Sequence, residues 1–330
     1  MTVPPRRRKY PLVALALGAL LTGCAVPAPA PAAPVPSARA LAAELGDNAS
    51  LAGLRLFPKS NPWNKRVDTS RVDKNSKKLI RGITGKLHPD FGAHWEGGPF
   101  GIPYVVVSGT QAKVPVSFGY DEESDAGPYP IPADAPIEGG SGSDGDRHVL
   151  VVDRDNRMLY ELYDAHPVNG GTSWTAGSGA IFDLTSNRLR PKGWTSADAA
   201  GLPILPGLVR YDEVASGKIT HAIRFTVATT RKAFVSPARH QAGSTRSSSR
   251  PPMGMRVRLK KSFKISGYPK QARVILQAMK TYGLILADNG SNWYFSGAPD
   301  SRWRDDQLSR IKNVPGSAFE VVKMGKITKG

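Results

Sequence analysis

Cysteine is almost absent from this 330-residue sequence, in which Cys24 stands alone. An internal disulfide is therefore excluded, and stability must come from a packed core, which a chain of this length can build. The sequence also lacks a phosphate-binding loop, the paired cysteines of a zinc finger and a Gly-x-Ser-x-Gly turn. These absences leave carboxylates, histidines and tryptophans as the residue types from which a site can be built, and they predict no cofactor and no metal.

The first 23 residues have the layout of a lipoprotein signal peptide. Basic residues at 6–9 precede an apolar run at 11–21 that is too short to span a membrane, and the run leads into Leu-Thr-Gly-Cys, ending at Cys24. These four residues resemble a bacterial lipobox, in which the cysteine is lipidated and becomes the new first residue. We therefore expect export, a lipid anchor at Cys24 in the bacterial cell envelope (outer membrane or cell surface), and a Pro/Ala-rich tether over 24–50.

Acidic residues are missing from a long internal stretch. Between Val214 and Ala287 the sequence has fifteen Lys and Arg and no Asp or Glu. A one-sided positive field attracts anionic partners, which predicts an anionic polysaccharide. Solubility, or adhesion to an anionic cell surface, is the alternative explanation. Nucleic acid is the weaker candidate, because the stretch offers few aromatic side chains for stacking bases.

Short strand-like runs separated by Pro and Gly dominate residues 51–330, which we expect to form one globular domain and a monomer. One clear helix is predicted over 269–282, where apolar residues from Ile275 to Tyr282 recur at i, i+3, i+4 and i+7. The expected fold class is α+β, mainly β: an antiparallel β-sandwich or barrel with one packed amphipathic helix.

The stretch GDRHVLVVDRDNRMLYELYDA, residues 145–165, predicts a β-hairpin with a polar turn. Asp146 and His148 stand two residues apart at the strand entry, so an extended chain points both side chains to one face. A carboxylate beside an imidazole can orient and charge it, which makes the pair a candidate catalytic site. The alternative is a half-buried, hydrogen-bonded histidine next to an aspartate that ends a Gly-rich loop.

Further catalytic candidates stand at predicted strand ends, where a scaffold can present a carboxylate to a cleft. Asp183 follows a small-residue strand, and Asp288 ends an apolar strand just before Asn-Gly. Burial would raise the pKa of either carboxyl group toward that of a general acid. Turn contacts are the alternative role for both. His221 is a catalytic candidate and Arg224 a substrate-binding candidate, although a strand would face them to opposite sides.

Tryptophan occurs in Gly-, Ser- or Asn-rich stretches rather than in apolar runs. Trp174, Trp194 and Trp293 are therefore candidates for stacking on sugar rings, with packing beneath long loops as the alternative. The segment containing His88, Asp90 and His94 could supply metal ligands, but a proline between the first two residues favours a structural turn.

Several stretches together resemble a group of uncharacterised exported bacterial proteins of lipoprotein type. They include LHPDFG, GPYPIPADAPIEGG, GDRHVLVVDRDN, GSGAIFDLTSN and ADNGSNWYFSG, and the resemblance covers most of residues 55–322. It implies one intact domain and brings no activity.

Export, a lipid anchor, strand-end carboxylates and loop tryptophans together favour a surface protein that acts on carbohydrate. We expect cleavage of an anionic polysaccharide by two carboxylates in a hydrolase, or by proton abstraction in a lyase. A non-catalytic protein that binds polysaccharide or the envelope is the alternative.

Overall fold

The hairpin expected from the sequence lies at the centre of a five-stranded sheet in the computed structural model, which describes residues 45–51 and 53–330. Its strands β7 (Val149–Asp153) and β8 (Met158–Tyr163) pair antiparallel. The order across the sheet is β1 (Gly46–Asp47), β5 (Val105–Val107), β7, β8 and β11 (Ser178–Asp183). The signal peptide, Cys24 and most of the tether lie outside the described residues.

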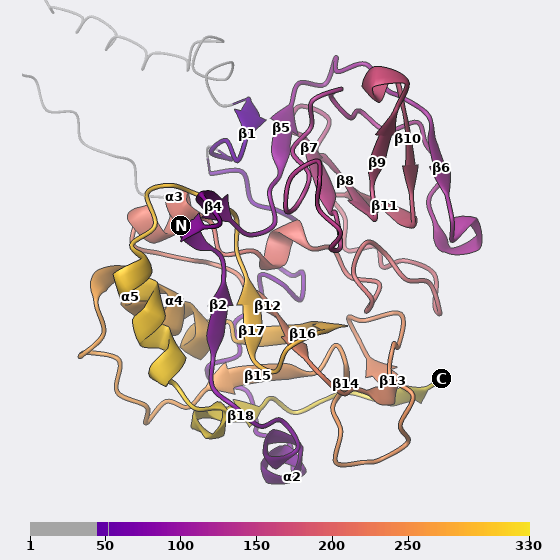
Figure 1. Cartoon of the computed structure of the whole chain (residues 1–330). Helices are drawn as coiled ribbons and strands as arrows, with labels where there is room; N and C mark the ends of the chain where they lie inside the picture. Colours follow the sequence, from indigo (N-terminus) through magenta and orange to yellow (C-terminus); the bar gives the residue numbers. More distant parts are fainter. Residues whose placement is uncertain (1–44, 52) are drawn as a thin grey trace, which may run out of the picture. The chain divides into compact units, whose positions relative to one another are not determined.

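A six-stranded sheet comes mainly from the C-terminal half of the chain (Figure 1). Its order is β18 (Phe319–Val321), β15 (Arg256–Leu259), β16 (Leu284–Asn289), β12 (Ile223–Val227), β17 (Tyr294–Ser296) and β2 (His88–Asp90). β12 and β16 run parallel, with Arg224 opposite Ile285 and Thr226 opposite Asp288. β2 joins from the N-terminal half and sets Asp90 opposite Ser296.

Three smaller sheets complete the β structure of the described residues. One has the order β6 (Val116–Phe118), β10 (Ser173–Ala176) and β9 (His166–Val168). Another has the order β14 (Pro252–Met253), β13 (Arg231–Val235) and β19 (Ile327–Lys329). The third is a hairpin of β3 (Gly92–Trp95) and β4 (Gly98–Phe100).

The predicted amphipathic helix is confirmed as α4 (Lys270–Thr281), and its apolar side chains from Ile275 to Tyr282 are buried. Figure 1 shows it beside α5 against the six-stranded sheet. The other α-helices of the described residues are short: α2 (Ser76–Arg81), α3 (Tyr211–Ala215) and α5 (Asp305–Ser309). Five single turns of 3₁₀-helix occupy Asp121–Glu123, Asn169–Gly171, Leu205–Gly207, Arg310–Asn313 and Gly316–Ala318.

Strand β7 contributes to two hydrophobic cores. Val149 and Val151 pack in a smaller core with Tyr129 and Trp174, whereas Leu150 and Val152 pack in the main core. Successive strand residues point to opposite faces, and both faces of this sheet are covered. This explains why β7 reads as a continuous apolar run rather than as an alternating one.

The α+β, mainly β class is confirmed, with several sheets and few helices. The sheets are mixed: parallel pairs join β5 to β7, β12 to β16, and β2 to β17. Each of these pairs joins strands far apart in sequence, which local strand patterns do not reveal.

Candidate functional site

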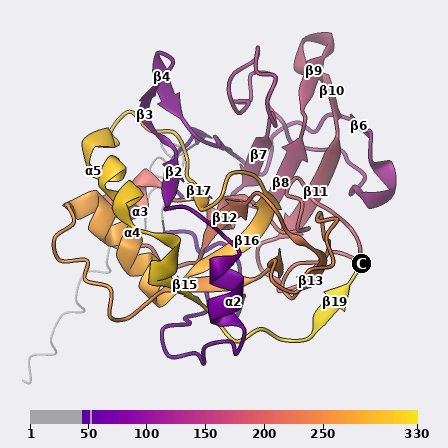
Figure 2. The same ribbon diagram turned by 60° about the horizontal axis from the view of Figure 1, so that its bottom comes forward.

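A cavity of about 490 Å³ is lined in part by residues of β8, β11 and the end of β16. Figure 2 shows these three strands in the ribbon. Three segments that the sequence analysis singled out separately therefore meet here: the start of the hairpin, the small-residue strand and the Asp-Asn turn. The lining residues are Tyr120, Glu123, Asp146, Tyr163, Ser178, Thr195, Ser196, Ala197, Ala199, His240, Asp288 and Asn289.

Asp288 is the lining carboxyl group with the most strongly altered proton affinity. Its side chain is 20% exposed, Oδ1 accepts the backbone N–H of Asn289 at 2.6 Å, and Oδ2 lies 3.3 Å from Nη2 of Arg224. Burial and the neighbouring carboxylate of Asp198 outweigh Arg224 and raise the pKa of Asp288 to about 7. At neutral pH this carboxyl group can therefore donate a proton as well as accept one.

Asp146 is exposed on the same cavity and differs from Asp288 in its surroundings. The Tyr163 hydroxyl connects the two electrostatically: desolvation, followed by the negative charge of Asp146, raises its pKa, and Asp288 adds to the effect. A half-buried carboxyl group with a raised pKa and an exposed carboxyl group on the same cavity form the arrangement that divides acid and base roles in carboxylate enzymes.

His240 adds an imidazole to this cavity. Its Nδ1 donates to the carbonyl oxygen of Ala199 at 2.8 Å, which fixes the tautomer of the neutral ring and leaves Nε2 as an acceptor. Among the described residues no hydrogen-bond partner of Nε2 is found.

His148 lies behind this cavity, completely buried, and both of its ring nitrogens are occupied. Nδ1 lies 2.5 Å from Oε2 of Glu138, and Nε2 donates to the carbonyl oxygen of Ala197 at 3.0 Å. Burial lowers the pKa of His148, but the charge and hydrogen bond of Glu138 outweigh it and raise the pKa to about 9. For Glu138 burial acts in the opposite direction and raises the pKa. The positive charges of His148 and Arg224 outweigh it, so the pKa of Glu138 lies below its ordinary value.

Arg224 on β12 is the centre of a second buried charged group. Nε and Nη2 donate to Oδ2 and Oδ1 of Asp198 at 2.8 and 3.0 Å, and Nη1 donates to Oγ of Ser296 at 2.7 Å. This two-pronged pairing holds the guanidinium rigidly. Since Arg224 is 5% exposed and fully engaged, its predicted role in binding substrate directly is wrong. It is a positioning residue for Asp288.

The spacing argument for Asp146 and His148 is also wrong, although both residues lie at this site. Arg147 between them adopts φ 47°, so the chain is not extended and the two side chains do not alternate as in a strand. Arg147 instead turns inward, and its guanidinium binds the carbonyl oxygens of Ser141, Ser143 and Ala165. The carboxylate that pairs with the imidazole is therefore that of Glu138.

Asp183 and His221 are catalytic candidates that the structure does not bring to this cavity. Asp183 is exposed, and its Oδ1 accepts hydrogen bonds from the N–H and hydroxyl of Thr185, as in a turn. His221 is buried, with Nδ1 donating to the carbonyl oxygen of Ala222 and Nε2 3.0 Å from Oε2 of Glu213. Both side chains stabilise local structure.

Two of the three candidate tryptophans are core residues, which corrects their assignment to sugar stacking. Trp174 is 2% exposed and Trp293 is 0% exposed, so neither presents a ring face to a ligand. Trp194 is partly exposed, but the Arg190 guanidinium lies over its ring, 5.5 Å from the centroid. Packing, the alternative considered above, describes Trp174 and Trp293, and the stacking role of Trp194 stays a prediction.

Much of the basic stretch is used inside the fold. The Arg256 guanidinium binds the carbonyl oxygens of Pro62, Lys65 and Tyr282, and Nζ of Lys280 donates to two loop carbonyl oxygens. Arg258 pairs with Glu320. These cations stabilise the loops by donating hydrogen bonds to backbone carbonyl oxygens that have no partner in a helix or sheet. Exposed cations remain at Lys261, Lys264 and Lys270 among others.

The possible metal ligands near residue 90 do not form a shared site. His88 stacks on Tyr294, with ring centroids 4.0 Å apart, and Nδ1 of His94 lies 3.0 Å from Oδ2 of Asp305. Across residues 45–51 and 53–330 there is no group of three or more His, Cys, Asp or Glu side chains placed to hold a metal ion.

Sequence reasoning missed Glu138, Asp198, Tyr163 and His240. Glu138 precedes two glycines of positive φ, and Asp198 lies in a short loop, so neither shows a helical or strand pattern. For Glu138 the sequence offered only a weak signal, an acidic residue between proline- and glycine-rich turns in the stretch GPYPIPADAPIEGG.

The chain matches no protein-family model, no curated protein and no solved structure. None of the helices in the part of the chain that the structure describes is long and apolar enough to cross a membrane.

Proposed function

We propose that the protein is a glycoside hydrolase whose reaction takes place in the cavity lined by Asp146 and Asp288. The observation that carries the proposal is the meeting of these two carboxyl groups on one cavity in unlike surroundings. Glycoside hydrolysis needs such a pair: one group gives a proton to the leaving oxygen, and the other activates water or attacks the sugar carbon.

Asp288 is the proposed general acid. Its pKa of about 7 leaves a large protonated fraction at neutral pH, and the rigid Asp198–Arg224 pair fixes the strand end from which it projects. Asp146 is the proposed base or nucleophile, because its exposed side chain can reach both water and substrate. His148 acts as a positioning residue, since Glu138 and Ala197 occupy both of its nitrogens.

Hydrolysis has more support than elimination. A lyase acting on uronic acid needs a cation beside the substrate carboxylate, but none of the residues that line this cavity is Lys or Arg. The sugar at the cleavage point is therefore neutral in this proposal. An anionic polymer is a second candidate through exposed cations elsewhere, such as Lys261 and Lys270. Export and attachment to the envelope through Cys24 are part of the proposal.

The test is release of reducing sugar from a panel of neutral, amine-bearing and uronic acid polysaccharides. Wild type is compared with Asp288→Asn, which keeps the shape of the side chain and removes its proton donor. We expect cleavage of a neutral member by wild type and loss of that cleavage in the variant. Binding of a polysaccharide without cleavage would favour the non-catalytic alternative, and equal cleavage by both proteins would overturn the assigned role of Asp288.

A further inference from the structure

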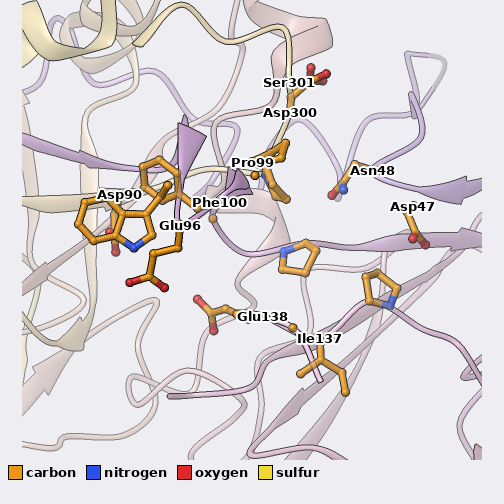
Figure 3. A pocket seen from close by; sticks show the side chains of 18 of the residues that line it. Asp47, Asn48, Asp90, Glu96, Pro99, Phe100, Ile137, Glu138, Asp300 and Ser301 are labelled. Carbon is orange, nitrogen blue, oxygen red and sulfur yellow. The ribbon is translucent and has the colours of Figure 1, made fainter. Parts of the chain in front are cut away.

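A second cavity, of about 880 Å³, is lined by a different set of side chains (Figure 3). Its walls come from four separate parts of the chain: the start of the described region, the segment 90–103 with the β3–β4 hairpin, the loop at 136–140 and the segment 299–302. Glu138 lines it and pairs with His148, whose Nε2 donates to the carbonyl oxygen of Ala197, a residue that lines the proposed catalytic cavity.

An exposed aromatic pair stands on the β3–β4 hairpin at this cavity. Trp95 is 64% exposed, and its ring centroid lies 6.1 Å from that of Phe100 at an interplanar angle of 49°. Trp63, Trp174, Trp293 and Trp303 are buried in the core, whereas most of the Trp95 side chain is open to solvent. A large aromatic surface held open to solvent beside a concave site is typical of ligand recognition.

Carboxylates supply the polar part of the same walls. Figure 3 shows Glu96 and Glu138 on one side of the cavity and Asp47 on the other. Carboxylate oxygens are strong acceptors for the hydroxyl groups of a sugar. Arg302 is the one lining residue among these with a positive charge, and it is already paired with Asp300 at 2.6 Å. A uronate would therefore meet uncompensated negative charge.

We propose that this cavity is a saccharide-binding site for neutral pyranose units, which stack on Trp95 and donate hydroxyl hydrogen bonds to Glu96 and Glu138. The inference rests on the proposed function in taking the ligand to be a polysaccharide. It assigns a second, non-catalytic contact with the polymer, separate from the cavity of Asp146 and Asp288.

The test is binding to an array of neutral, amine-bearing and uronic acid oligosaccharides, measured in an Asp146→Asn background that does not consume the ligand. We expect neutral oligosaccharides to bind, Trp95→Ala to weaken their binding about fivefold, and Trp95→Phe to restore most of it, since an aromatic contact contributes about 1 kcal/mol. The exposed Trp95 can be removed without leaving a core cavity. Val72→Ala, an exposed apolar change that does not touch this cavity, is the matched control.

Three results would overturn the inference: no array member binds, only uronates bind, or Trp95→Ala binds neutral oligosaccharides as tightly as its parent. Failure of the proposed function gives a different result. In that case wild type binds the neutral oligosaccharides, Trp95→Ala weakens the binding, and no member of the panel is cleaved.

Discussion

Nδ1 of the buried His148 lies 2.5 Å from Oε2 of Glu138, although the two residues belong to a strand entry and a separate Gly-rich loop. The Glu138 side chain is 26% exposed, whereas that of His148 is 2% exposed, so loss of the carboxylate would leave a buried imidazolium without its compensating charge. The pair therefore determines how stability depends on pH.

The first prediction concerns that dependence. Because the folded pKa of His148 is about 9 and its ordinary value is 6.5, the proton on His148 stabilises the fold fully below pH 6.5. This contribution is lost as pH rises toward 9, and its size is on the order of 3 kcal/mol. Urea unfolding measured from pH 6 to 9.5 should show the free energy of unfolding falling across this window.

The control for this prediction is Glu138→Gln. Without the carboxylate, burial lowers the pKa of His148, so the fall above pH 6.5 should shrink while the protein becomes less stable overall. Asp288 and Glu161 also become charged near pH 7, so the comparison uses the difference between the two curves. Parallel curves for the two proteins would contradict the pairing of His148 with Glu138.

The second prediction is that Asp146→Asn removes activity and leaves stability nearly unchanged. The side chain is exposed, so the free energy of unfolding should change by less than about 1 kcal/mol. Loss of a general base should lower kcat by a factor of ~10² to 10⁴. A melting curve and a cleavage assay measure the two effects, with Asp183→Asn as an equal change of charge away from the cavity. Full activity with a lowered melting temperature would end the catalytic assignment of Asp146.

The third prediction is that the protonation of Asp288 sets the fall of kcat/KM on the alkaline side of the pH profile. The acid must be protonated to act, so kcat/KM should fall as pH rises through about 7, the pKa of this group in the fold. In Asp198→Asn one negative neighbour is removed, which lowers the pKa of Asp288 and should shift the limb to lower pH. Rates from pH 5 to 9 give the profile for both proteins. A limb that does not move would show that another group sets it.

The fourth prediction separates core tryptophans from ligand contacts. Trp293→Ala should lower the free energy of unfolding by about 3 to 5 kcal/mol, because it empties a fully buried site beside Phe225 and Phe319. Trp194→Ala, at a partly exposed position, should cost much less. Chemical denaturation of both variants makes the comparison. Equal losses in the two would argue against the burial of Trp293.

The fifth prediction concerns the anchor, which lies outside the described residues. Cys24→Ser should abolish lipidation and release the protein from membranes into the soluble fraction, because the hydroxyl group cannot replace the thiol that receives the lipid. Fractionation of cells that express each form gives the answer. A serine variant that still partitions as an integral lipoprotein would refute the anchor at Cys24.

The sequence was most informative where structure is local. The β7–β8 hairpin and helix α4 were predicted within a residue or two, because each depends on periodicity and on a turn or cap in the same short stretch. Asp146 and Asp288 could be selected for the same reason, as polar residues at the ends of apolar strands. Their meeting on one cavity depends on how two sheets pack, which neither stretch encodes by itself.

The rest of the site depends on long-range partners. Glu138 pairs with a histidine ten residues away across a loop, and Arg224 pairs with Asp198, 26 residues earlier. The positive φ of Arg147 misdirected the strand argument, because arginine gives no sign of that conformation in the sequence. Trp174 and Trp293 were misassigned because their sequence neighbours are polar, whereas the apolar groups that cover them come from distant parts of the chain.

Strand β7 lies between the two hydrophobic cores, with Val149 and Val151 in the smaller core and Leu150 and Val152 in the main core. If the smaller core unfolded, one face of β7 would be exposed to water and its backbone pairing with β8 would be weakened. The packing of the main core against the other face of β7 would then be destabilised as well. The two cores are therefore expected to unfold together and not one at a time. A single cooperative transition follows, and a cut of the chain after β11 would divide the main core, whose residues come from both sides of that point.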